Sequence, residues 1–154
     1  MRRDGRLSGV LHVLLHMAEA DGPVTSERLA TMMATNPVVV RRTMAGLRDL
    51  GLVASGKGHG GGWVIARDLD GVTLRDVYVA LGSPGIFAMG HRSANPTCLV
   101  EQAVNASLGG AFAEAEALLL ARLGSVTLGR LSADFHARLG KRGPCGQEAR
   151  HDDA

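Results

Sequence analysis

The sequence is poor in aromatic residues, in cysteine and in net charge, and each shortage excludes a class of protein. Because aromatics make up only 3% of the 154 residues, a hydrophobic core must be built mainly from aliphatic side chains. The 2 cysteines do not supply the disulfide framework that supports small secreted domains. No apolar run is long enough to span a bilayer, and the start of the chain lacks the pattern of a signal peptide. We therefore expect a cytoplasmic protein without a membrane segment.

The charge of the chain is small but unevenly distributed. The formal net charge of +2 is too small to indicate a polyanionic partner by itself, so the distribution of the charges along the chain is the better indicator. Between Pro37 and Arg67 the only acidic residue is Asp49. The basic residues of that segment are Arg41, Arg42, Arg48, Lys57 and Arg67. The small positive charge is therefore concentrated in one segment, which favours a nucleic-acid partner.

Apolar periodicity and cap residues predict a series of helices and one hairpin. Helices are expected over residues 7–20, 26–34, 36–50, 73–81, 98–123 and 127–139. Two short strands, 52–55 and 63–66, flank a glycine-rich turn, which is typical of a hairpin. Asn36 followed by Pro37 is a clear helix start, because Asn caps a helix and Pro suits its first turn. The predicted fold class is mainly α with a small β-hairpin.

Composition also predicts how the chain is divided. Residues 82–97 are rich in Gly, Ser, Pro and Asn, which is typical of a linker. We therefore expect a DNA-binding domain at 1–81, dimerisation helices at 98–139, and a flexible polar tail at 140–154. The long helix has an apolar stripe that few remaining residues could cover, so a second copy of the chain is expected to pack against it.

Helices at 7–20, 26–34 and 36–50, followed by a hairpin, are the order of a winged helix-turn-helix. The third helix is the predicted recognition helix, with Val40, Met44 and Leu47 facing the core and the opposite face free to enter a major groove. Arginine suits that face, because its guanidinium binds both guanine edges and phosphates. The glycines of the hairpin let its backbone approach DNA, and Lys57 suits a narrow minor groove. The predicted DNA-binding residues are Ser26, Asn36, Pro37, Val38, Val39, Arg41, Arg42, Arg48, Lys57, His59, Gly60 and Gly61. Arginines at the N-terminus, Arg6 among them, are expected to add phosphate contacts.

Several motifs of the chain occur together in one known family. They are Pro23–Ser26, Asn36–Arg42, Leu50–Val53, Gly60–Gly62 before an aromatic residue, Thr73–Tyr78, and Asn95-Pro96 shortly before Cys98. In this combination, over about residues 7–131, the sequence resembles the Rrf2 family of bacterial transcriptional regulators. The resemblance implies a homodimer whose long helices cross and whose two winged helices bind a palindromic operator in double-stranded DNA. Repression is the usual output of the family.

Many members of that family bind an iron–sulfur cluster through three closely spaced cysteines before the long helix. Here that segment holds Cys98 alone, and a cluster needs several thiolate or substitute ligands. Cys145 lies far along the chain, so we predict no cofactor. Cys98 is either a redox thiol, because a helix start lowers a thiol pKa, or a small packing residue. A small-molecule or redox effector stays open.

Two other features of the sequence, a histidine pair and the acids of the long helix, are compatible with a metal site or an enzyme. His12 and His16 have the spacing of a helical metal pair, but no third ligand is evident, so surface or dimer-contact histidines are favoured and no metal is predicted. The acids of the long helix lack a partner base or nucleophile, so no enzymatic activity is expected. The competing class is a winged-helix module that binds protein. Its third helix would be uncharged or acidic, whereas the helix at 36–50 is basic.

Overall fold

The computed structural model describes residues 4–58, 60–87 and 89–142. Its elements in chain order are α1 (Arg6–Ala18), α2 (Ser26–Met32), α3 (Pro37–Asp49), β1 (Val53–Ser55), β2 (Trp63–Ile65), the 3-10 helix η1 (Leu69–Gly71), α4 (Leu74–Ala80), α5 (Leu99–Gly124) and α6 (Leu128–Arg142). This confirms the predicted fold class, mainly α with one antiparallel hairpin. Element ends differ from the predicted ones by at most three residues, and η1 was not predicted.

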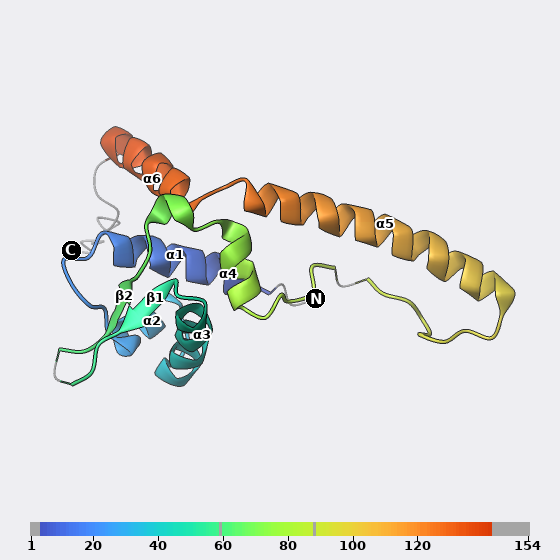
Figure 1. Ribbon diagram of the computed structural model, residues 1–154, viewed down its shortest axis with the longest axis horizontal. Coiled ribbons are helices and arrows are strands. Elements are labelled where there is room, and N and C mark those ends of the chain that lie inside the picture. The colour runs from blue at the N-terminus through green and yellow to red at the C-terminus, as the bar shows by residue number, and fades with distance from the viewer. Residues whose placement is uncertain (1–3, 59, 88, 143–154) are drawn as a thin grey trace, which may run out of the picture.

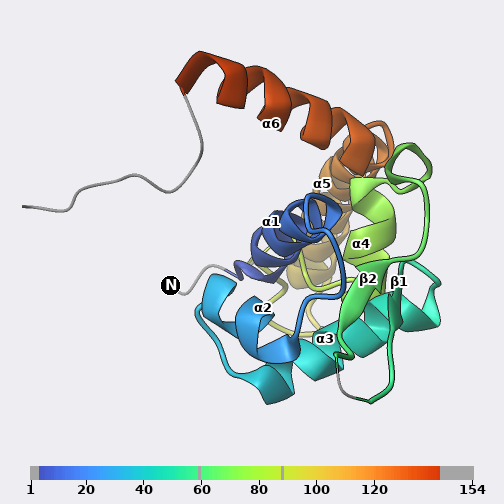
Figure 2. The same ribbon diagram turned by 90° about the vertical axis from the view of Figure 1, so that its left-hand side faces the viewer.

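The first four helices surround an aliphatic core, as the shortage of aromatic residues requires (Figure 2). The side chains that are most completely buried are Val10, Val13, Leu14, Leu29, Val40, Met44, Leu47, Val53, Val72, Val77 and Leu128. Trp63 and Tyr78 are the aromatic residues of the buried set. Because the core draws on α1, α2, α3, α4 and both strands, it fixes α3 and the hairpin relative to each other.

The hairpin is joined to the loop that precedes α2. Its strands pair antiparallel, with Ser55 opposite Trp63. Val24 extends the sheet by one bridge: its N–H donates to the Trp63 carbonyl at 3.0 Å, and the Trp63 N–H donates to the Val24 carbonyl at 2.9 Å. A Cβ on Gly62 would lie 2.8 Å from that Val24 carbonyl oxygen, so this close approach needs glycine. The wing is thereby held against the start of the helix-turn-helix.

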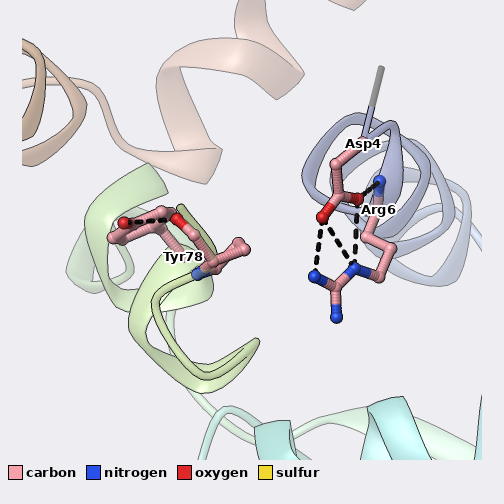
Figure 3. Close-up of polar contacts among 4 residues, drawn as sticks. Asp4, Arg6 and Tyr78 are labelled. Carbon is pink, nitrogen blue, oxygen red and sulfur yellow. Dashed lines mark hydrogen bonds and ion pairs between the residues drawn. The ribbon is translucent and has the colours of Figure 1, made fainter. Parts of the chain in front are cut away.

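Helix α5 extends away from the winged domain as a long rod (Figure 1). Its 26 residues correspond to about 39 Å at about 1.5 Å per residue. The segment that precedes α5 lies alongside this helix. Asn105 of α5 donates a hydrogen bond to the Ser93 carbonyl at 3.0 Å, and the rings of Phe87 and Phe112 lie 5.8 Å apart. At the near end, the Tyr78 hydroxyl donates to the Pro84 carbonyl at 2.8 Å (Figure 3). The linker is therefore packed against α4 and α5.

Helix α6 returns to the winged domain and lies across α1 (Figure 2). Its first residue, Leu128, is 2% exposed within the core, and its N–H donates to the Val72 carbonyl at 2.8 Å. The sequence pattern places α6 with α5 in the predicted segment 98–139, and it does not indicate this packing on α1. Among the described helices, none is both long and apolar enough to cross a membrane. The predicted tail at 140–154 lies outside the described residues from 143 onward.

Candidate nucleic-acid interface

Helix α3 is seated by its cap and by three core residues. The Asn36 side chain accepts a hydrogen bond from the Val39 N–H at 3.0 Å, and Pro37 occupies the first turn. Val40, Met44 and Leu47 are each 0% exposed, as predicted from their spacing. Because these three side chains are fully buried on one face, they fix the orientation of α3 about its own axis. The opposite face of α3 is therefore fixed toward solvent.

That exposed face is apolar at its start and basic further along. Val38 is 61% exposed and Val39 is 41% exposed. Exposed aliphatic groups of this kind suit contact with the methyl group of thymine. Arg41, Arg42 and Arg48 are all exposed as well, so α3 offers both apolar and cationic groups on the face predicted to meet DNA.

Two of the three arginines are paired with carboxylates. Arg41 Nη2 lies 2.9 Å from Glu27 Oε1, and Arg48 Nη2 lies 3.3 Å from Asp49 Oδ1. Exposed pairs of this kind contribute little to stability, so a phosphate can replace either carboxylate at small cost. Arg42 makes no ion pair with another described residue. Sequence reasoning missed Glu27, because only the packing of α2 on α3 brings it to Arg41.

An open hollow of about 300 Å³ lies between the start of α2, α3 and the wing. Its lining residues are Thr25, Ser26, Glu27, Arg41, Ser55, Gly56, Gly58, Gly61, Gly62 and Trp63. Three predicted DNA-binding residues, Ser26, Arg41 and Gly61, therefore surround one space. A hollow with a guanidinium, a hydroxyl and close backbone can receive an anionic group such as phosphate.

Ser26 has a structural partner that the sequence did not reveal. The Trp63 indole N–H donates to Ser26 Oγ at 3.0 Å, which links the wing to α2. Trp63 is 7% exposed, so this bond satisfies a donor that water can hardly reach. The Ser26 hydroxyl keeps its own proton, which it can still donate into the hollow. In the sequence, the one indication of this contact is the lone Trp at the start of the second strand, whose indole N–H needs a hydrogen-bond partner when it is buried.

The wing tip is a tight turn whose glycines serve its own geometry. A Cβ on Gly61 would lie 2.7 Å from the Gly56 carbonyl oxygen and 2.8 Å from that of Gly58, so the turn leaves no room for a side chain. Gly58 and Gly60 have φ angles of 88° and 82°, in the left-handed region that favours glycine. Lys57 and Gly60 are exposed at the tip. His59, also predicted to contact DNA, lies outside the described residues.

Arg6, the first arginine among the described residues, forms an ion pair within the chain. Arg6 Nη2 lies 2.6 Å from Asp4 Oδ2 at the start of α1 (Figure 3). This hydrogen bond with Arg6 lowers the pKa of Asp4 to about 2. This pair is exposed like that of Arg41, so a phosphate can replace the Asp4 carboxylate at small cost and Arg6 stays a candidate for phosphate contact. Arg2 and Arg3 lie outside the described residues.

Cys98 is exposed at the residue that precedes α5. Backbone N–H groups of Glu101 and Val100, in the first turn of the helix, lower the pKa of its thiol. Over residues 4–58, 60–87 and 89–142 no three side chains from His, Cys, Asp and Glu gather around one point. Cys145 is outside the described residues. Within the described part of the chain, Cys98 is therefore the only thiol, and it does not by itself fit an iron–sulfur cluster of the kind that the family resemblance raised.

A buried helical core that presents a basic third helix, with a hairpin beside it, defines the winged helix-turn-helix class of DNA-binding regulators. The family model for Rrf2, described as an iron-dependent transcriptional regulator, matches residues 4–134. The chain therefore belongs to the Rrf2 family of transcriptional regulators, which confirms the resemblance seen in its motifs.

Individual relatives agree with this assignment. The chain is 28% identical over 125 residues to YwnA of Bacillus subtilis strain 168, which is named as an HTH-type transcriptional regulator; the match covers 81% of this chain and 92% of YwnA. A solved transcriptional regulator from Lactobacillus plantarum is similar with a TM-score of 0.71 at 24% identity, covering 88% of this chain and 92% of that one. The global cysteine regulator CymR of B. subtilis has a TM-score of 0.59 at 20% identity, covering 87% and 98%. At these identities the structures show a shared fold.

Proposed function

We propose that this protein is a cytoplasmic, homodimeric repressor that binds a palindromic operator. The observation that carries the proposal is the face of α3: the core fixes it toward solvent, Val38, Val39 and the arginines occupy it, and the wing stands beside it. In this arrangement α3 enters the major groove, and the wing follows the backbone with Lys57 near the minor groove. Asn36, Pro37, Ser26, Gly60 and Gly61 contact the sugar-phosphate chain.

The exposed apolar surface of α5 supports the proposed homodimer. None of its residues is buried in the single chain. Its exposed large apolar side chains are Leu99, Val100, Val104, Leu108, Leu118 and Leu119. A second copy of α5 would remove this surface from water, and a two-fold axis would place the two α3 helices on half-sites about one helical turn apart, or a multiple of it.

Arginine substitutions on α3 test the DNA-binding face. Genomic fragments bound by the purified protein supply the operator, in which we expect an inverted repeat. Arg42→Ala should weaken operator binding by about 5- to 150-fold, as expected for loss of a contact worth about 1–3 kcal/mol. Arg41→Ala should weaken it less, because the wild-type guanidinium must first leave Glu27. Both variants should remain dimers in sedimentation experiments.

Fluorescence anisotropy at several salt concentrations is the measurement. If the lost contact is to phosphate, the slope of log affinity against log salt should fall by about 0.9. Arg130→Ala is the matched control, since it removes the same charge from an exposed position on α6. Wild-type affinity in both α3 variants would show that the DNA-binding face has been assigned wrongly.

A second candidate function, redox control through Cys98, is favoured by its exposed thiol of lowered pKa. Hydrogen peroxide would oxidise the Cys98 thiols of two subunits to one disulfide. The two thiols give up two electrons and two protons, and the peroxide is reduced to two molecules of water. Titrating operator binding with peroxide should inactivate the wild type and spare Cys98→Ser. Equal sensitivity of the two proteins would remove this hypothesis.

A further inference from the structure

Two histidines of α1 face each other beside a small cavity under α6. Nε2 of His12 and Nε2 of His16 are 3.0 Å apart, and their ring centroids are 4.6 Å apart. The cavity has a volume of about 120 Å³ and is lined by His12, Leu15, His16, Glu19 and Phe135. Both histidines are exposed, so a solute can reach their ring nitrogens from water.

The separation of the two nitrogens fits a shared metal ion. Nitrogens bound at about 2.0–2.1 Å, at an angle of about 90–110°, lie roughly 2.8–3.4 Å apart. The two nitrogens now share a hydrogen bond, which a metal ion would replace at nearly the same nitrogen separation.

Glu19 is the available third ligand. It follows His16 by about one helical turn and lines the same cavity. Its Oε1 is now 3.0 Å from Nε2 of His136 on α6. This explains why no three donors yet surround one point within the described residues. Rotation of the Glu19 side chain away from His136 would complete a set of two nitrogens and one carboxylate.

We propose that His12, His16 and Glu19 form a binding site for a divalent transition-metal ion, with water completing its coordination. Two imidazoles and one carboxylate suit ions such as Zn²⁺ and Co²⁺. None of these residues belongs to the predicted DNA-binding set, so the site goes beyond the proposed function. Metal binding exchanges the hydrogen bond between Glu19 and His136, which joins the end of α1 to α6, for a Glu19–metal bond.

Cobalt titration of the full chain tests the site. The protein carries Cys98→Ser and Cys145→Ser, which remove thiolate ligands, and is treated with a chelator before Co²⁺ is added. Visible absorption of bound Co²⁺ should show one equivalent, displaced by Zn²⁺. We expect His12→Gln, His16→Gln and Glu19→Gln each to weaken Co²⁺ binding at least tenfold.

Two matched histidine variants sharpen the test. His91→Gln, in the linker against Phe112, should leave Co²⁺ affinity unchanged. His136→Gln should raise it several-fold, because Glu19 loses its present partner. Co²⁺ affinity equal to the parent's in a His12→Gln/His16→Gln protein would overturn the site, and weaker binding in His136→Gln would show that Glu19 is not the third ligand as proposed. Circular dichroism checks that each variant is folded. If His16→Gln fails to fold, the Co²⁺ affinity of His12→Gln decides the test, because His12 is exposed and its replacement should not disturb the core.

Discussion

Replacing Ser26 with alanine tests how the wing is joined to the helix-turn-helix. Ser26 begins α2, and its Oγ accepts the hydrogen bond from the Trp63 indole N–H at 3.0 Å. Alanine removes this acceptor and leaves the rest of the helix start in place, because the side chain that caps α2 is that of Thr25. The substitution therefore isolates one contact between α2 and β2.

The structure sets the size of the expected effect. Leaving a buried donor without a partner costs about 1–3 kcal/mol. Because Trp63 is 7% exposed, water reaches its edge to a small extent, and we expect the lower half of that range, about 1–2 kcal/mol. For a chain of this length, that corresponds to a fall in Tm of roughly 2–8 °C at fixed protein concentration.

Fluorescence gives a direct assay, because Trp63 is the single tryptophan of the chain. Thermal melts followed by its emission should show the lower Tm, and the native emission spectrum should change as the indole N–H loses its partner. Ser55→Ala is the matched control: Ser55 lines the same hollow, and its hydroxyl makes no hydrogen bond to another described residue. A Tm and an emission spectrum for Ser26→Ala equal to those of Ser55→Ala would refute the role given to this bond.

Two further substitutions test the packing that positions α3 and α6. Leu128→Ala should destabilise the protein by about 2–5 kcal/mol, because Leu128 is 2% exposed in the core; a loss below about 0.5 kcal/mol in thermal melts would contradict the docking of α6. Gly46→Ala should cost about 1–3 kcal/mol in urea unfolding, because its Cβ would lie 2.6 Å from the Ala80 carbonyl oxygen, a backbone atom that has little freedom to move. Since alanine is intrinsically the better helix former by about 1 kcal/mol, a gain in stability would show that α3 and α4 are not in this close contact.

Features fixed by neighbouring residues were predictable from the sequence. The start of α3 is one example, because Asn36 caps it and Pro37 occupies its first turn, and both act within a few residues. The inward face of α3 is another, because helical periodicity placed Val40, Met44 and Leu47 together. In each case the determinant and the structure it produces lie in the same short segment.

Features that depend on distant residues were not predictable. The amphipathic pattern of α6 indicates that one face is buried, but it does not say against what, and the packing of Leu128 beside Val72 depends on the whole path of α5. The predicted site shows the same limit. Ser26, Arg41 and Gly61 were each chosen for local reasons, whereas their common hollow and the Glu27 partner of Arg41 exist only once α2, α3 and the wing have packed.

The position of α3 relative to the long helix depends on the contacts of α4. Helix α4 packs on α3 on one side and on α5 on the other. At the α3 side the two backbones meet at Gly46 with no side chain between them, so nothing there can rearrange to absorb a shift. The backbone bridge between Thr73 and Thr127 also ties the start of α4 to the turn between α5 and α6. Through these contacts, we expect a change in the angle of α5 against α4 to be transmitted to α3.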